Sequence, residues 1–139
     1  MAVQQTMCAS FKQQLFLAQH DLSTDVIKIA LYTSASSIGP DTTVYTSTNE
    51  VTGTGYVAGG NTLTGVTVLL SGTTAYVDFA DSAWAASSFT ARGALLYNSS
   101  KSNKAVAVLD FGADKTSSGT PFVIQMPTNS ATTALLRIA

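Results

Sequence analysis

Charged residues are scarce in this chain of 139 residues: Asp, Glu, Lys and Arg make up 11% of it, and the net charge is −1. Globular domains usually carry about a quarter of their residues as charges. Binding a nucleic-acid backbone needs clustered Lys and Arg, and the densest basic pair here is Lys101 and Lys104. No apolar run approaches the ~18 residues of a membrane-spanning helix. The composition therefore predicts neither a direct nucleic-acid partner nor a membrane partner.

Histidine and cysteine occur once each, as His20 and Cys8. This excludes a two-His metal centre, an internal disulfide and a Cys-based zinc site. A Ser–His–Asp triad would have to use His20, which stands beside Asp21 where a predicted helix ends. A partly protonated imidazole bound to the last helical carbonyls is the simpler interpretation. Cys8 is interpreted as a small, at least half-buried residue rather than a nucleophile. We expect no enzyme, no cofactor and no metal.

The first ten residues, MAVQQTMCAS, lack the basic and apolar regions of a signal peptide. This favours assembly in a cytoplasm. The Asn98-Ser-Ser100 sequon matters only in a secreted eukaryotic protein, and no signal sequence supports that context.

Thr and Ser, in contrast, make up about a quarter of the chain, which is typical of β-proteins with uncharged polar surfaces. From Asp25 onward the apolar residues recur with a period of two. Short strands are expected at 26–33, 62–70, 73–80, 88–98, 104–111, 121–127 and 132–139, with turn clusters such as GADKTSSGT between them. The Ser-Gly step at 71–72 indicates a hairpin. We predict a mainly β fold, an antiparallel β-sandwich or jelly roll of seven to eight strands, over residues 25–139.

Residues 1–24 are expected to form a separate N-terminal arm with one short helix. In SFKQQLFLAQHDL, Ser10 and Gln13 have the spacing of a capping box. An apolar stripe follows at helical spacing, and it could cover the open end of the sandwich or bind a neighbouring subunit; its members are Phe11, Leu15, Ala18 and Leu22.

Arg92 is the one charge within the otherwise apolar and small-polar run WAASSFTARGALLYNSS. On a strand 88–98 it shares a face with Thr90 and Ala94, opposite Phe89 and Leu95. The acidic residues nearest in strand context are Asp78 and Asp110, each in an apolar–Asp–Phe sequence. We predict a structural ion pair that joins Arg92 to both carboxylates, with a subunit contact as the alternative.

Three further features were weighed for chemistry. The loop GTGYVAGG (53–60) is not a phosphate-binding motif, because it has the wrong glycine spacing and no following Lys-Ser or Lys-Thr; its glycines are expected to supply positive φ. The carboxylates Asp78, Asp81, Asp110, Glu50 and Asp114 show no acid–base pairing by position. Trp84 is interpreted as a core or interface anchor, with sugar stacking as an alternative.

Two blocks, YTSTNEVTGTGYVAGG and FTARGALLYNSSKSNKAVAVLDFGADK, together with SFKQQLFLAQHDL and DVIKIALYTSAS, resemble a family of small virion structural proteins of tailed bacteriophages. The resemblance covers roughly residues 7–126 and includes Glu50 and Arg92. It implies a non-enzymatic particle protein, and small β-sandwiches of this size look like capsid decoration (cement) proteins. The expected partners are then the major capsid protein and a second copy in a homodimer or homotrimer, and the expected location is the virion surface. A neck, tail or head-fibre component is the alternative, and a host-glycan-binding module is a further one.

Overall fold

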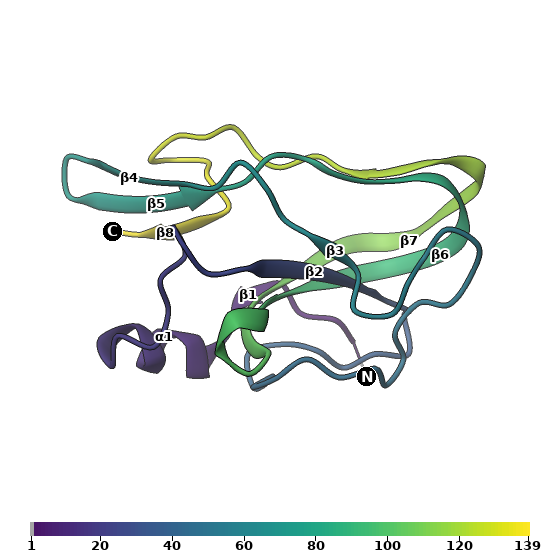
Figure 1. Ribbon diagram of the computed structural model, residues 1–139, viewed down its shortest axis with the longest axis horizontal. Helices are drawn as coiled ribbons and strands as arrows, with labels where there is room; N and C mark the ends of the chain where they lie inside the picture. Colours follow the sequence, from purple (N-terminus) through teal and green to yellow (C-terminus); the bar gives the residue numbers. More distant parts are fainter. Residues whose placement is uncertain (1) are drawn as a thin grey trace.

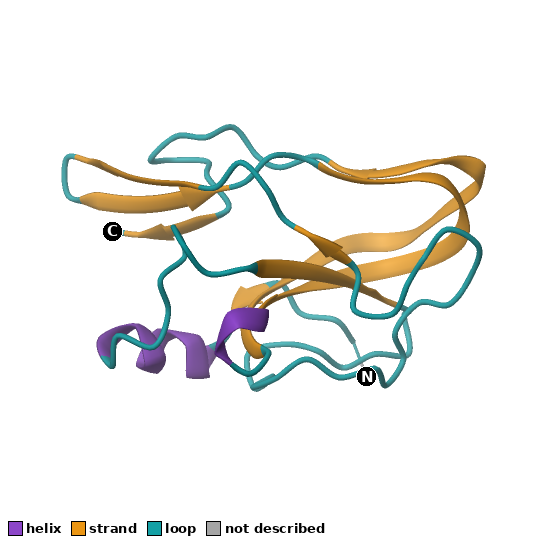
Figure 2. Cartoon of the chain, viewed as in Figure 1, coloured by secondary structure: helices purple, strands orange, loops and turns teal. Residues whose placement is uncertain are grey.

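The computed structural model describes residues 2–139 and confirms a mainly β fold that contains one short α-helix. Within that range, eight strands form two antiparallel sheets, of five and three strands, in an arrangement consistent with a β-sandwich (Figures 1 and 2). The elements in chain order are β1 (Thr6–Met7), α1 (Ala9–Phe16), β2 (Ile27–Tyr32), β3 (Asn61–Thr62), β4 (Thr67–Ser71), β5 (Thr74–Asp78), β6 (Ser82–Asn98), the 3₁₀ turn η1 (Ser99–Lys101), β7 (Lys104–Ile124) and β8 (Leu136–Ile138).

The five-stranded sheet has the order β1-β7-β6-β2-β3 and is built around one long hairpin, β6–β7. β2 lies against β6 with Ile29 opposite Leu96 and Leu31 opposite Ala94. All but one residue of β2 is buried. The centre of the core is therefore the contact between β2, β6 and β7.

The β6–β7 hairpin bends over on itself near its middle, at the right-hand end of Figure 1. Register shifts accompany the bend at Trp84/Ser87 and Ser87/Ser88. β-bulges of this kind let a strand turn sharply while its ladder continues. Ser87 is fully buried at the bend, where its hydroxyl bonds the Ser117 hydroxyl at 2.8 Å and the Thr120 carbonyl at 2.9 Å. The hydroxyls of Ser87 and Ser117 are thus satisfied inside the chain.

The second sheet has the order β4-β5-β8 and lies beside the bent hairpin on the same side of the molecule as α1 (Figure 1). β4 and β5 are joined by the two-residue turn Gly72–Thr73, in which Gly72 has a φ of 58°. This confirms the predicted hairpin, with its turn one residue later than expected. None of the helices in residues 2–139 is long and apolar enough to span a membrane.

Several strand limits differ from the prediction. The cluster GADKTSSGT is not a turn: it lies inside β7, which runs without interruption from Lys104 to Ile124. Gly112 and Gly119 adopt positive φ within that strand, so these residues bend the strand rather than end it. The predicted strand 62–70 is divided into β3 and β4 around Gly65, whose φ is 63°. Segment 132–139 is extended only over Leu136–Ile138.

The helix also starts differently from the prediction. Its N-cap is Cys8, no side chain caps it, and Ser10 lies inside the first turn with its hydroxyl buried and without a hydrogen-bond partner in the described chain. The capping-box prediction is therefore wrong. The amide of Ala9 donates to the Pro40 carbonyl instead, and the amide of Cys8 to the Val106 carbonyl. Tertiary contacts to a loop and to β7 replace the local cap.

The apolar stripe is confirmed in part as packing. Phe11 and Leu22 are buried in the core and Leu15 is half-buried. Ala18 is exposed and has a φ of 55°, because the helix ends at Phe16 and the chain turns there. Phe11, Leu15 and Leu22 of the stripe therefore pack against their own chain, and Ala18 does not.

Candidate functional site

Arg92 and Asp110 form the ion pair that the sequence predicted, and Asp78 does not take part in it. Arg92 lies at a register shift of β6, and its Nε is 3.3 Å from Asp110 Oδ1 across the β6–β7 ladder. The two side chains are 34% and 28% exposed. The Gly112 amide and then Arg92 hold the pKa of Asp110 below its ordinary value. This is a half-exposed cross-strand pair with a structural role.

The prediction for Asp78 is wrong because β5 and β6, although consecutive in the sequence, lie in different sheets. Asp78 ends β5, whose partners are β4 and β8, whereas β6 lies between β7 and β2 in the other sheet. Asp78 is 3% exposed, and its Oδ1 accepts a hydrogen bond of 2.9 Å from the Phe79 amide. Its Oδ2 is buried and has no hydrogen-bond partner among the described residues. Burial, and then the nearby Asp81, raise the pKa of Asp78.

A cluster of tyrosine side chains surrounds Glu50, which lies in a segment predicted to be a loop. Glu50 is buried at an isolated bridge to Tyr32. Its Oε1 accepts a hydrogen bond of 2.6 Å from the Tyr45 hydroxyl, and its Oε2 accepts one of 2.6 Å from the Tyr56 hydroxyl and one of 2.8 Å from the Gly59 amide. The Tyr97 hydroxyl donates to the Gly59 carbonyl at 2.6 Å. Both carboxylate oxygens thus accept hydrogen bonds from the chain's own donors, one at Oε1 and two at Oε2.

Burial and the neighbouring Glu50 raise the pKa of Tyr45 and of Tyr56, so both phenols stay protonated and donate to the carboxylate. Gly60, which has a φ of 75°, explains part of the loop's glycine content: a Cβ there would lie 1.8 Å from the Ile29 carbonyl oxygen. This confirms the structural interpretation of GTGYVAGG. The Glu50 cluster locks the 33–60 connection onto the sheet and offers no free catalytic atom.

His20 belongs to a second, partly buried polar cluster rather than to a helix end. Its Nε2 is 2.8 Å from Gln14 Oε1, and its Nδ1 is 3.0 Å from the amide nitrogen of Asn98. Asn98 is fully buried and also donates to Asp25 Oδ2 at 2.8 Å. Nδ1 therefore accepts, Nε2 carries the proton, and burial lowers the pKa of His20. The prediction of a partly protonated imidazole on the last helical carbonyls is wrong, because both ring nitrogens have side-chain partners.

Two other side chains weighed for chemistry are packed away from solvent. Cys8 is fully buried, its thiol points to the Gly39 carbonyl at 3.9 Å, and burial raises its pKa to about 11. Trp84 is 4% exposed, stacks on Tyr56 and contacts Phe89 and Phe122 edge-to-face. The interpretation of Trp84 as a core anchor is confirmed, and its burial contradicts sugar stacking on it.

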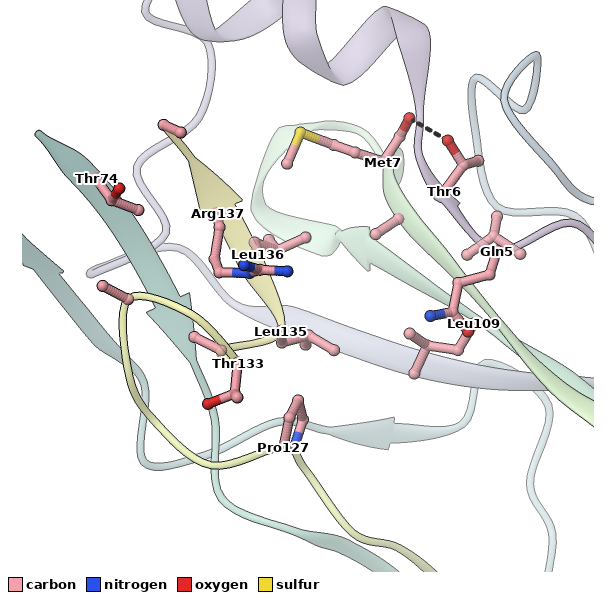
Figure 3. Close-up of a pocket in the computed structure, with 15 residues that line it drawn as sticks. Gln5, Thr6, Met7, Thr74, Leu109, Pro127, Thr133, Leu135, Leu136 and Arg137 are labelled. Atoms are coloured by element: carbon pink, nitrogen blue, oxygen red, sulfur yellow. Dashed lines mark hydrogen bonds between the residues drawn. The ribbon is translucent and has the colours of Figure 1, made fainter.

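A cavity of about 690 Å³ separates β8 and the segment before it from β1 and β7 (Figure 3). Thr6 and Met7 line it on one side and Leu135, Leu136 and Arg137 on the other. Arg137 is the one titratable side chain among the described residues that line it. The cavity therefore holds neither an acid–base pair nor a nucleophile.

A groove of about 710 Å³ lies between α1 and the second sheet. Its walls carry the four stripe residues of the helical segment and, from the facing sheet, Val68, Val77, Leu136 and Ile138. At the end of the helix, Phe16 is 94% exposed, and Leu17 beside it is exposed as well. We refer to this groove together with Phe16 and Leu17 as the helix face; it is a candidate surface for protein contact.

In residues 2–139, no group of three or more His, Cys, Asp or Glu side chains could by itself hold a metal ion. Comparisons of the chain with family models, with curated proteins and with solved structures found no match.

Proposed function

We propose that the chain is a non-enzymatic structural protein of a tailed-phage virion, and more specifically a capsid decoration (cement) protein that binds between major capsid protein subunits and stabilises them. The observation that carries this proposal is an unprotected apolar surface made by the β4 edge and the helix face. The polar clusters around Glu50 and Asn98 support the non-enzymatic part of the proposal, because both side chains hydrogen-bond to other residues of the same chain.

β4 is an edge strand, paired with β5 alone. A two-residue hairpin closes on a hydrogen-bonded pair, here Ser71 with Thr74. Alternation then turns the backbone N–H and C=O groups of Val68 and Leu70 outward. The strand is free of charge and proline, and Leu70 is 72% exposed. It lacks the features that usually keep an edge strand from pairing.

The free edge of β7 shows the contrast. Beyond Leu109 this strand pairs with β6 alone. It carries Asp114 and Lys115 between Gly112 and Gly119, the two glycines of positive φ at which the strand bends. Charges and bends of this kind discourage edge pairing. The chain protects one long edge and leaves β4 open, which favours β4 as the contact with a second copy in a homodimer or homotrimer.

The helix face is assigned to the major capsid protein. Its walls are mostly apolar, with His20, Asp21 and Ser23 as the polar residues. An exposed aromatic residue such as Phe16 is a typical anchor of protein interfaces. Apolar contact over such a groove, spread over many copies, would stiffen a shell without any chemical step.

A neck, tail or head-fibre position is the alternative within the same structural class. The host-glycan alternative loses its main residue, because Trp84 is buried. Quantitative mass spectrometry of purified virions separates these cases: hundreds of copies per particle support the cement role, and about a dozen or fewer support the neck or fibre role. Absence of the chain from washed particles overturns the proposal.

A further inference from the structure

A small pocket of about 190 Å³ lies where the second sheet meets the segment that follows β7. Its walls come from the start of β4, from the turn after β5, and from the segment 126–129 that leads toward β8. Four oxygen-bearing side chains line it: Thr67, Asp78, Asp81 and Asn129. The function proposed above makes no use of this pocket.

Asp78 is the unusual member of this set. It is nine-tenths or more buried, Oδ1 is bound by the Phe79 amide, and Oδ2 has no hydrogen-bond partner among the described residues. Both ion pairs in the described chain use other carboxylates, those of Asp110 and Asp25. A buried carboxylate with one unsatisfied oxygen is costly unless a positive charge or a proton compensates it.

The other three side chains are held by contacts that leave oxygen lone pairs available. Asp81 Oδ1 accepts a hydrogen bond of 2.7 Å from the Met126 amide, which fixes its carboxylate at the pocket. Asn129 donates through Nδ2 to Thr67 Oγ1 at 2.9 Å. The amide carbonyl of Asn129 and the second oxygen of Asp81 are therefore free to accept from a ligand.

We infer that this pocket binds a divalent cation, Ca²⁺, with Asp78 and Asp81 as the anionic ligands and Asn129 and Thr67 as neutral oxygen ligands. Ca²⁺ prefers carboxylate, amide and hydroxyl oxygens and completes an irregular shell with water. Mg²⁺ demands near-octahedral geometry and keeps most of its own water, so it fits this mixed set less well.

Binding would supply the positive charge that Asp78 lacks. It would also tie the segment 126–129 to the β4–β5 hairpin, and so stabilise the sheet in which β8 pairs with β5.

The test is thermal unfolding and isothermal titration calorimetry on the purified full chain, at neutral pH, in EDTA and then with increasing CaCl₂. We expect the Tm to rise with Ca²⁺ and to saturate, because a ligand that binds only the folded state stabilises it. Even outer-shell partners contribute about 10–100-fold to metal affinity, so loss of a direct ligand should raise the half-saturating Ca²⁺ concentration at least tenfold. Asp81→Asn, at an exposed position, makes that change without disturbing the core; Asp114→Asn, on the free edge of β7, is the matched control and should respond like the wild type.

The Asp78→Asn variant distinguishes Ca²⁺ binding at Asp78 from protonation of Asp78. If Asp78 ligates Ca²⁺, this variant loses the Ca²⁺-dependent rise in Tm. If Asp78 is simply protonated, the wild type shows no response to Ca²⁺ and the variant is at least as stable in EDTA, which overturns the inference. An equal rise in Tm with NaCl at the same ionic strength also overturns it, because that result shows screening rather than binding. These measurements use the isolated chain, so their outcome is independent of where the protein sits in a particle.

Discussion

The Tyr56 hydroxyl donates a hydrogen bond of 2.6 Å to Glu50 Oε2, and the same hydroxyl oxygen accepts one of 2.9 Å from the Leu31 amide. One phenol thereby connects a central strand of the core to the buried carboxylate of a long loop. Because Tyr45 and the Gly59 amide complete the shell, the 33–60 connection is fixed by a charged group in place of regular secondary structure.

Replacing Glu50 with Gln keeps the shape of the side chain and puts an NH₂ group where one hydrogen bond is accepted. A buried donor then loses its acceptor, so we expect the free energy of unfolding to fall by about 1–3 kcal/mol. Urea denaturation measures this, with the exposed Asp41→Asn as the control. A change no larger than that of the control would contradict the role given to the cluster.

Arg92→Ala should have a much smaller effect. The pair with Asp110 is about one-third exposed at each side chain, and the Gly112 amide still binds Asp110 when Arg92 is gone. Exposed pairs contribute about 0–1 kcal/mol, and we expect a loss of stability within that range. A double-mutant cycle with Asp110→Ala isolates the coupling; a coupling well above that range would show that the pair fixes the register of β6 and β7 more strongly than its exposure implies.

The pH dependence of stability should carry a contribution from His20. Burial holds its pKa in the folded state below the ordinary value of 6.5, so the unfolded chain binds the proton more readily. The stability that this group contributes is present above pH 6.5 and is lost as the pH falls through the lower folded-state pKa. Urea unfolding between about pH 8 and about pH 5 should therefore show a steeper acid-side loss for the wild type than for His20→Gln. Parallel curves for the two proteins would contradict the neutral-imidazole assignment.

The open edge of β4 predicts self-association. Leu70→Lys places a charge on the exposed strand, and we expect it to weaken dimer or trimer formation in sedimentation velocity while leaving the Tm of the monomer nearly unchanged. Ala113→Lys, at an exposed position on the charged edge of β7, is the matched control. Equal association of both variants would remove β4 from the interface.

The sequence predicted those features of the fold that depend on residues close in the chain, and missed those that depend on contacts between distant segments. Period-two alternation predicted β2, the Ser-Gly step predicted the β4–β5 hairpin, and the next strand in the sequence supplied the cross-strand partner Asp110. All three depend on segments that are close in the sequence. The predicted ion pair of Asp78 with Arg92 was wrong, because strand order in a sheet is decided by packing between distant segments. The prediction also failed at 112–120, where turn-forming residues are carried by a bent strand whose partner β6 supplies the hydrogen bonds.

The Glu50 cluster could not be predicted from the sequence for a related reason. Tyr32, Tyr45, Tyr56 and Tyr97 are scattered along the chain, and no spacing rule brings them to one carboxylate. The available signal was a lone glutamate close to several tyrosines and glycines in a chain with few charges. A carboxylate in such a setting is a candidate for burial with hydroxyl donors.

Cryo-electron microscopy of purified virions tests the central proposal most directly. The account predicts density for this chain on the outer surface of the capsid in hundreds of copies, with the helix face against major capsid protein subunits and β4 against a second copy. Density confined to the neck, the tail or a few fibres would contradict the cement role, and a particle without this chain would contradict its place among virion proteins.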